Sequence, residues 1–352
     1  MAPAPRPPPP RPPRTEAARL VETPELTQDA RILNFLAEGG EGFISGEALS
    51  TRLGLSRTAV WKHVEALRVK GYRIDAVPAK GYRLVGRPDR LSALEVHPLL
   101  ATRAVGRVLH HHDTIGSTNA AAFRLAQDGA GHGTVVVAEQ QTAGKGRRGR
   151  AWVSPPNLNL YFSAILRPEL PPQRAPELTL VAAVALAETL REAGADAAIK
   201  WPNDVQISGR KVAGILTELS AEPERVHFVI VGVGVNLNSG EEHFPEELRA
   251  TATSLALALG RPVARAPFAA ALWTRLETWL DTYLATGFDA VRTRWKALSS
   301  TLGVQVRVRT DRGDWEGFAE DIDPTGALMV RMADGRVERV LAGDVEQLRP
   351  QR

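Results

Sequence analysis

The pattern of apolar and polar positions divides the chain into three regions. Between residues 28 and 69, apolar residues recur at intervals of three and four, which places them on one face of a helix. Three such runs follow one another, and Ser45 and Ser56 precede the second and third, where a helix needs a capping hydroxyl. Two alternating runs, 72–76 and 82–85, come next on either side of a turn. This order predicts a winged helix-turn-helix.

A longer region mixes short β-type runs with long helical ones. Residues 118–127, 177–193 and 266–286 carry apolar stripes with helical spacing. Six short runs are rich in β-branched and aromatic residues, which favours strands. These strands are expected at 134–139, 158–166, 197–201, 204–207, 211–219 and 225–236. Since most strands are joined by turns and only a few by helices, we expect an α+β sheet with helices mostly on one face.

The two ends of the chain differ from this body. From residue 304 onward, short alternating runs are separated by turn sequences, for example at 311–314 and 333–335, so a small all-β unit is expected. Residues 2–13 are dominated by proline, which removes amide donors and prevents a packed core. The predicted division is a disordered tail at 1–24, a winged helix-turn-helix at 25–86, a central domain at 87–302 and a C-terminal β domain at 303–352.

Composition narrows the classes of protein. A chain of 352 residues is too long for one small core, which agrees with several domains. The absence of cysteine excludes disulfides, thiolate metal sites and a cysteine nucleophile, and it fits a cytoplasmic location. No apolar run reaches the roughly 20 residues of a membrane span, so no membrane contact is expected. The net charge of +4 permits nucleic-acid binding without requiring it.

The third predicted helix presents polar side chains, Arg68 among them, away from its apolar stripe. Such a helix enters the major groove of DNA, and the turn of the hairpin is placed to contact the phosphate backbone. Trp61 either contacts bases from this face or packs under the hairpin. A helix-turn-helix that binds protein is the alternative. The residues expected to contact DNA are Arg57, Thr58, Lys62 and Lys80.

The segment 138–152, A-E-Q-Q-T-A-G-K-G-R-R-G-R-A-W, combines four cations with three glycines. Glycine lets the backbone approach a ligand closely, and arginine offers planar, permanently charged donors that fit carboxylate or phosphate oxygens two at a time. The pattern therefore favours a loop that wraps an anionic small molecule. A basic surface loop is the alternative.

Five segments, taken in order, resemble the biotin–protein ligases. They are G-S-T-N at 116–119, the loop at 138–152, K-W-P-N-D at 200–204, G-R-K-V-A-G-I-L at 209–216 and G-V-G-V-N at 232–236. With the helix-turn-helix, the chain from about residue 28 to its end is similar to the bifunctional bacterial type, a ligase that is also the biotin-operon repressor. The resemblance implies an α+β multidomain fold with a class II synthetase-like ligase domain, built on a mixed sheet, and a C-terminal SH3-like barrel.

The resemblance also implies a reaction in two steps. The carboxylate of biotin attacks the α-phosphate of ATP to give biotinyl-5′-adenylate, and a lysine of an acceptor protein then attacks the adenylate. Arg147 corresponds to the catalytic arginine of the family, and Lys200 is the second expected catalytic residue. Lys145 stands where many relatives carry arginine, so it keeps the charge but loses bidentate geometry. Mg²⁺ is expected to bind through ATP.

Further residues are assigned to the two substrates, ATP and biotin. Ser117 is alternatively a plain N-cap, and Asn203 and Asp204 are also ordinary turn residues. The residues expected to bind biotin are Ser117, Thr118, Asn119, Gln141, Lys145, Gly146, Arg147, Lys200, Gly214 and Leu216. Those expected to bind the nucleotide are Arg148, Arg150, Trp152, Asn203, Asp204 and Asn236.

The implied partners are the biotin carboxyl carrier protein of acetyl-CoA carboxylase, or another biotin-dependent carboxylase, and double-stranded operator DNA. A homodimer is expected because one helix-turn-helix reads only a half-site, and an edge strand at 205–207 and 211–215 is the expected contact. Two other functions compete: a lipoate–protein ligase, and a repressor that senses biotin without ligating it. The glycine–arginine loop and the helix-turn-helix disfavour the first, and the presence of Arg147 and Lys200 disfavours the second.

Overall fold

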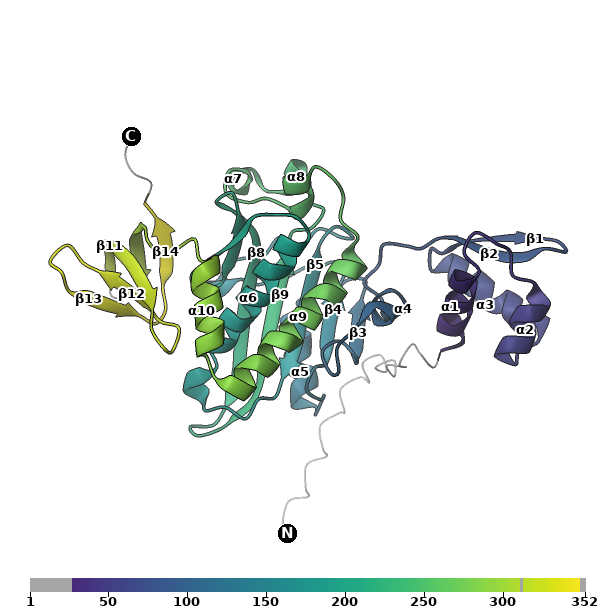
Figure 1. The fold of residues 1–352 in the computed structure, drawn as a ribbon, viewed down its shortest axis with the longest axis horizontal. Helices are drawn as coiled ribbons and strands as arrows, with labels where there is room; N and C mark the ends of the chain where they lie inside the picture. Colours follow the sequence, from purple (N-terminus) through teal and green to yellow (C-terminus); the bar gives the residue numbers. More distant parts are fainter. Residues whose placement is uncertain (1–26, 311–312, 349–352) are drawn as a thin grey trace, which may run out of the picture.

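The computed structural model describes residues 27–310 and 313–348, which form three bodies along one long axis (Figure 1). A helical head comes first, a central sheet with helices follows, and a smaller sheet lies at the opposite end. The predicted proline-rich tail and part of the turn at 311–314 lie outside the described residues. No helix in the described part of the chain is long and apolar enough to cross a membrane.

The head contains the predicted three helices and hairpin. Thr27, Ser45 and Ser56 cap the helices by accepting hydrogen bonds from amides in their first turns. The apolar stripes of the helices meet in one core with Tyr72 and Ile74, so the predicted helix-turn-helix with its hairpin is confirmed. The elements are α1 (Gln28–Glu38), α2 (Gly46–Leu53), α3 (Arg57–Val69), β1 (Arg73–Val77) and β2 (Gly81–Gly86).

Two residues fasten the hairpin to the helices. A side chain at Gly81 would place its first carbon 2.0 Å from the carbonyl oxygen of Ile44, so only glycine fits there. Arg68 donates hydrogen bonds of 3.0 and 2.5 Å to the carbonyl oxygen of Ile74. The prediction that Arg68 faces outward is therefore wrong, because its guanidinium group turns back onto the hairpin.

The central sheet has seven strands in the order β3-β4-β5-β9-β8-β7-β6. The pair β3–β4 is parallel and the other pairs are antiparallel, so the sheet is mixed as expected. The edges are β3 and β6. The prediction of an edge at 205–207 and 211–215 is wrong, because β7 and β8 both have a neighbour on each side. The strands are β3 (Leu109–His112), β4 (Val135–Ala138), β5 (Leu160–Leu166), β6 (Ala197–Lys200), β7 (Asp204–Ile207), β8 (Arg210–Ala221) and β9 (Val226–Val235).

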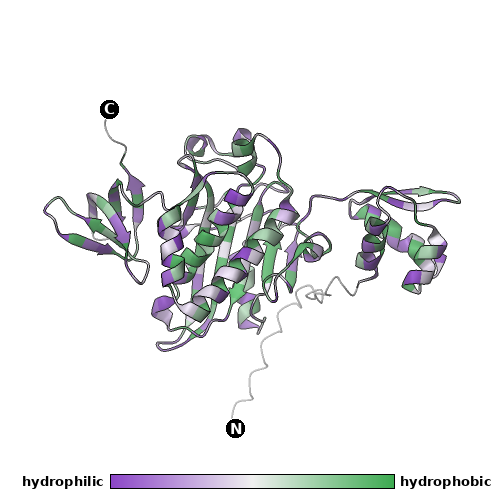
Figure 2. Cartoon of the chain, viewed as in Figure 1, coloured by the Kyte–Doolittle hydropathy of each residue, from purple (hydrophilic) through white to green (hydrophobic). Residues whose placement is uncertain are grey.

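Three long helices cover one face of this sheet and one helix covers the other. Val135 and Val137 of β4 belong to the large core under the three helices, whereas Val136 packs with Ala122 of α5 on the opposite face. Apolar residues concentrate on the strands between these layers (Figure 2). The covering helices are α6 (Glu177–Glu192), α9 (Arg265–Thr286) and α10 (Asp289–Leu298), and the opposite helix is α5 (Thr118–Gln127). Short helices are α4 (Ala93–Val96), α7 (Glu246–Arg249) and α8 (Leu255–Leu259), with 3₁₀ turns at His97–Leu99, Arg147–Gly149, Pro172–Arg174 and Glu241–His243.

The C-terminal body is the predicted small all-β unit. Its five strands are antiparallel neighbours in the order β13-β12-β11-β10-β14. Among the described residues no pairing of β13 with β14 closes this sheet into a barrel. The strands are β10 (Gln305–Thr310), β11 (Gly313–Ile322), β12 (Leu328–Arg331), β13 (Val337–Val340) and β14 (Asp344–Gln347).

The segment between the head and the central sheet, residues 87–91, is fastened on both sides; we call it the connector. Asp89 pairs with the fully buried Arg265 of α9, at 3.0 Å from its Nε. The amide of Leu91 donates to Glu139 Oε1 at 2.9 Å, and Arg265 donates to Glu139 Oε2 at 2.6 Å. On the head side, the hydroxyl of Tyr72 donates to Glu95 of α4 at 2.5 Å. The connector between the head and the central sheet is therefore fixed in place by polar contacts, several of them buried.

Candidate functional site

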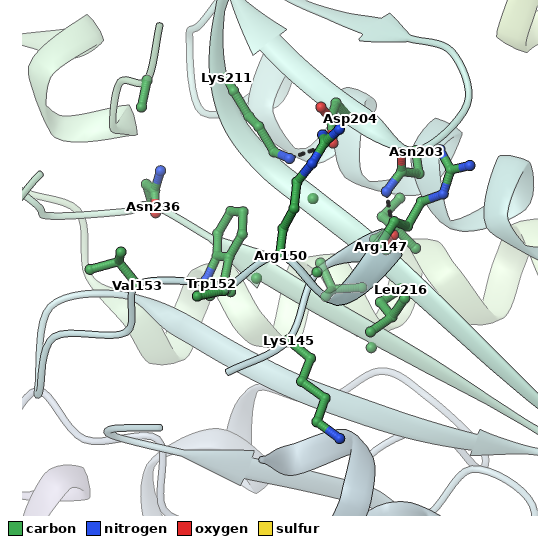
Figure 3. A pocket seen from close by; sticks show the side chains of 18 of the residues that line it. Lys145, Arg147, Arg150, Trp152, Val153, Asn203, Asp204, Lys211, Leu216 and Asn236 are labelled. Atoms are coloured by element: carbon green, nitrogen blue, oxygen red, sulfur yellow. Dashed lines mark hydrogen bonds and ion pairs between the residues drawn. The ribbon is translucent and has the colours of Figure 1, made fainter. Parts of the chain in front are cut away.

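A pocket of about 330 Å³ opens where the loop after β4 crosses the strands β8 and β9 (Figure 3). The start of α5, the turn between β6 and β7, the segment after β9 and the start of β14 complete its walls. Fifteen of the sixteen residues predicted to bind biotin or nucleotide line it; the exception is Arg148. The sequence segments singled out as separate motifs therefore meet in one place.

The glycine–arginine loop folds back on itself as a tight hairpin. The amide of Gly146 donates to the carbonyl of Arg150 at 2.7 Å, and the amide of Trp152 donates to the carbonyl of Gly144 at 2.9 Å. A side chain at Gly144 would come within 2.5 Å of the Trp152 carbonyl oxygen, so glycine is needed for this approach. Arg148, at φ 54°, makes the reversal with a left-handed backbone.

The arginines of this loop lie against the C-terminal sheet. Arg147 donates to Asn203 Oδ1 at 3.2 Å and to the carbonyl oxygen of Gly343 at 3.3 Å. Arg150 pairs with Asp344, and Arg148 lies 3.7 Å from the same carboxylate. Burial lowers the pKa of Arg147, while the carboxylates of Asp344 and Asp204 act in the opposite direction. Arg147 is thus a half-buried cation whose hydrogen-bond acceptors are neutral oxygens.

Lys200 stands at the end of β6, and the next residue fixes its position. Trp201 is 2% exposed, its amide donates to Thr301 Oγ1 at 2.9 Å, and its indole donates to the carbonyl of Gly326 at 3.1 Å. Because the neighbouring side chain is anchored in the core, the lysine is held at the pocket wall. Lys145 also lines the pocket, but its side chain points away from Arg147 (Figure 3).

A polar cluster forms one end of the pocket. Thr118 donates from its amide and its hydroxyl to Gln141 Oε1, at 2.9 and 3.1 Å, and Gln141 donates to Ser154 Oγ at 3.1 Å. Asn119 is buried, and its amide group donates to Leu216 O at 3.1 Å and to Glu218 at 2.7 Å. Ser117 precedes α5 but its side chain makes no capping bond, so the plain N-cap alternative does not describe it.

The indole of Trp152 lies against two glycines of the sheet. A side chain at Gly234 would come within 2.5 Å of this indole, and one at Gly214 within 3.2 Å. The Nε1 of Trp152 is buried and has no hydrogen-bond partner among the described residues. Lys211 Nζ lies 5.4 Å from the ring centre. Because Gly214 and Gly234 have no side chains, the indole of Trp152 can pack directly on β8 and β9. Asn236 also lines the pocket, and it donates to Thr253 O at 3.1 Å.

Sequence reasoning missed several residues of the pocket. Lys211 lies within a quoted motif, and its ammonium group is 2.6 Å from Asp204 Oδ1 (Figure 3). Asp344 had no local signal, because it reaches the loop only through the packing of the C-terminal sheet. The missed residues of the segment after β9 are Ser239, His243, Phe244, Leu248, Thr251 and Ala252. Among the described residues, no group of three or more histidine, aspartate or glutamate side chains could hold a metal ion.

The residues predicted to contact DNA lie apart from this pocket, in the head. Arg57, Thr58 and Lys62 are exposed on α3, and Lys80 is exposed at the hairpin turn. Arg57 pairs with Glu47 of α2 at 3.1 Å, an exposed pair. Trp61 is 53% exposed, so it does not pack under the hairpin.

Models of known protein families match all three bodies of the chain. The model of the biotin/lipoate A/B protein ligase family matches residues 112–236, a helix-turn-helix model matches 30–83, and the biotin protein ligase C-terminal domain matches 301–347. The bifunctional ligase/repressor BirA of Bacillus subtilis is 42% identical over 90% of this chain and 97% of its own length. The biotin–[acetyl-CoA-carboxylase] ligase of Paracoccus denitrificans is 40% identical over 62% of this chain and 92% of its own length. The biotin protein ligase of Aquifex aeolicus, solved with biotin and ATP, superposes with a TM-score of 0.59 at 29% identity, over 69% of this chain and 99% of that one.

Proposed function

Because this chain belongs to the biotin protein ligase family and is similar to its bifunctional ligase/repressors, we propose a function in two parts. The protein activates biotin with ATP and transfers it to a lysine of a carrier protein, and it also represses biotin genes. One observation carries the catalytic part. Arg147 and Arg150 of one loop and Lys200 of a distant motif line a single pocket beside glycine-containing strands. Such a pocket gathers positive charge where two anionic substrates must meet.

In the first step a carboxylate oxygen of biotin attacks the α-phosphorus of ATP. The bond from the α-phosphorus to the bridging oxygen breaks and pyrophosphate leaves. Arg147 holds the carboxylate and then the adenylate phosphate by paired hydrogen bonds, because its present acceptors are neutral and can be exchanged. Lys200 stabilises the charge that develops between the two anions.

In the second step an uncharged lysine amine of the acceptor attacks the acyl carbon of the adenylate. The bond between that carbon and the phosphate oxygen breaks, AMP leaves, and the amine gives up a proton as the amide forms. The same two cations stabilise the leaving phosphate. The acceptor is the biotin carboxyl carrier protein of acetyl-CoA carboxylase or a related carboxylase, in line with the Paracoccus denitrificans enzyme named for that acceptor.

The pocket fits Mg²⁺ only as a companion of ATP. Its two carboxylates, Asp204 and Asp344, come from different bodies and are paired with Lys211 and Arg150. Mg²⁺ is commonly held by one or two carboxylates and by substrate phosphates. Asp204 is the residue that we assign to this ion. When bound, the ion supplies charge neutralisation at the phosphates.

The other predicted residues that line the pocket are assigned to biotin or to the nucleotide according to their position in it. The polar cluster around Ser117, Thr118 and Gln141 binds the ring system of biotin, with Leu216 as an apolar wall. Asn119 positions this cluster, since its amide group is already bonded within the chain. Trp152, Asn203 and Asn236 bind the nucleotide.

The head makes the protein a DNA-binding repressor, with a homodimer matched to a palindromic operator. The helix-turn-helix match and the Bacillus subtilis relative named as a ligase/repressor support this part. We also propose that the C-terminal sheet belongs to the SH3-like class, with the barrel left open between β13 and β14 in the described residues. We further propose that the central domain is class II synthetase-like and that the protein works in the cytoplasm, where ATP and DNA are available.

A labelling assay tests the ligase. The full chain is incubated with Mg·ATP, a carrier domain and either biotin or lipoate, and the mass of the carrier is measured. We expect a biotin adduct and pyrophosphate release, and no lipoate adduct. Lipoylation would instead identify a lipoate ligase, and absence of both adducts would leave only a biotin-sensing repressor. A gel shift on the promoter of a biotin-synthesis operon, with and without biotin plus ATP, tests repression.

A further inference from the structure

Trp61 is the most exposed aromatic side chain in the described part of the chain. It is 53% exposed, on the outer face of α3, and it takes no part in the core of the head. Burial of a large aromatic side chain is one of the main contributions to stability or binding that a residue can make. A tryptophan left outside the core is therefore available to an external partner.

The surroundings of Trp61 match a DNA duplex better than an apolar protein groove. Arg57 and Thr58 lie one turn before it, and Lys62 follows it, and all three are exposed. The neighbouring face of the helix carries the buried Val60 and Val64, so Trp61 lies at the border between the core and the exposed face. A recognition helix contacts base edges with its N-terminal residues, while cations around them contact phosphates. In this docking mode Trp61 faces a base edge, and the residues around it are suited to contact the phosphate backbone of the DNA.

Among base pairs, only those with thymine present an apolar group on the floor of the major groove, its C5-methyl. The indole face gains contact area from this methyl, whereas the other edges offer only donors and acceptors. We propose that Trp61 is a specificity-determining residue that packs on the C5-methyl of a thymine in each operator half-site. This inference rests on the proposed DNA-binding function.

The test replaces thymine by deoxyuridine, which removes the methyl and keeps every hydrogen-bonding group. Duplexes that the full chain prefers, with biotin and Mg·ATP present, are first selected from a randomised pool. Each thymine of a selected duplex is then replaced singly, and the Kd is measured by fluorescence anisotropy at fixed salt. At one position in each half-site we expect roughly fourfold weaker binding, the effect of one buried methyl group.

The Trp61→Ala variant should bind the selected duplex about tenfold more weakly and lose its response to that deoxyuridine. Trp61→Phe should keep part of the response. Lys62→Ala is the matched control: it should weaken binding to all duplexes, lower the salt slope by about one, and keep the full response. Circular dichroism and thermal melting of each variant, compared with the wild type, confirm that the head is folded.

Three results would overturn the inference or its premise. Unchanged deoxyuridine profiles in Trp61→Ala would show that another residue reads the methyl. A wild-type chain that prefers certain sequences but ignores every deoxyuridine would refute the methyl contact. A wild-type chain that selects no sequence from the pool would refute the DNA-reading function on which the inference rests.

Discussion

Two arginines in this molecule differ in the groups that accept their hydrogen bonds. Arg265 is fully buried and meets two carboxylates, those of Asp89 and Glu139, and further accepting oxygens of the backbone. Arg147 of the glycine–arginine loop is only half-buried and donates to an amide oxygen and a carbonyl oxygen. A cation committed to carboxylates holds the structure together, whereas one resting on neutral oxygens remains available to an anionic ligand.

The strongest test of this comparison removes the committed cation. Arg265→Leu should lower the free energy of unfolding of the central domain by about 3–5 kcal/mol, because the buried carboxylate of Glu139 loses the guanidinium group that pairs with it. Urea denaturation followed by tryptophan fluorescence measures this. Arg103→Leu removes a surface pair with Asp281 and should cost less than about 1 kcal/mol. Equal losses in both variants would remove the distinction.

Replacing Arg147 or Lys200 should lower the rate of the reaction and leave the stability of the fold nearly unchanged. Arg147→Ala and Lys200→Ala should each lower pyrophosphate release about 10²–10³-fold, since each removes a pocket cation that we propose stabilises the reacting phosphate. Thermal melting should show a folded protein in both cases. Turnover close to that of the wild type in both variants would place the chemistry elsewhere.

The pH dependence of stability sharpens the comparison further. Burial by itself raises the pKa of Glu139, but the hydrogen bond with His111, the charge of Arg265 and the Leu91 amide together hold this pKa at about 2, below its ordinary 4.5. The stabilisation is therefore complete above pH 4.5 and is lost as the pH falls toward 2. The difference in unfolding free energy between wild type and Glu139→Gln should shrink by at most about 1.4 kcal/mol per pH unit in that window. A difference that stays constant from pH 5 to 3 would contradict this.

The smallest effect is expected at Arg150. Its side chain is 67% exposed in its pair with Asp344, so Arg150→Ala should change stability by no more than about 0.5 kcal/mol. Its effect on pyrophosphate release should be weaker than that of Arg147→Ala, measured in the same assay. A larger rate loss than for Arg147→Ala would reverse the assigned roles.

The sequence predicted those parts of the site whose chemistry is concentrated in short segments. The loop at 138–152 and the motif at 200–204 stand out because glycine, arginine and lysine are packed together there. Asp344 and Arg265 escaped notice, since each acts only through residues more than a hundred positions away. The edge of the sheet was predicted at the wrong strands because the short strand β6 pairs with the outer side of β7. The order in which strands pair depends on the tertiary fold, so local sequence patterns do not predict it.

Glu139 binds the connector through the Leu91 amide, and two residues later Gln141 binds Thr118 at the wall of the pocket. The root of the DNA-binding head and the proposed biotin site are therefore fastened to the same three residues of chain. If a ligand in the pocket changes operator affinity through these residues, the two binding equilibria are linked, and such linkage is reciprocal. If the adenylate raises operator affinity by some factor, the operator must raise adenylate affinity by that same factor. A repressor bound to its operator would then bind the adenylate more tightly than a free one, so operator sites would select the adenylate-bound form of the protein.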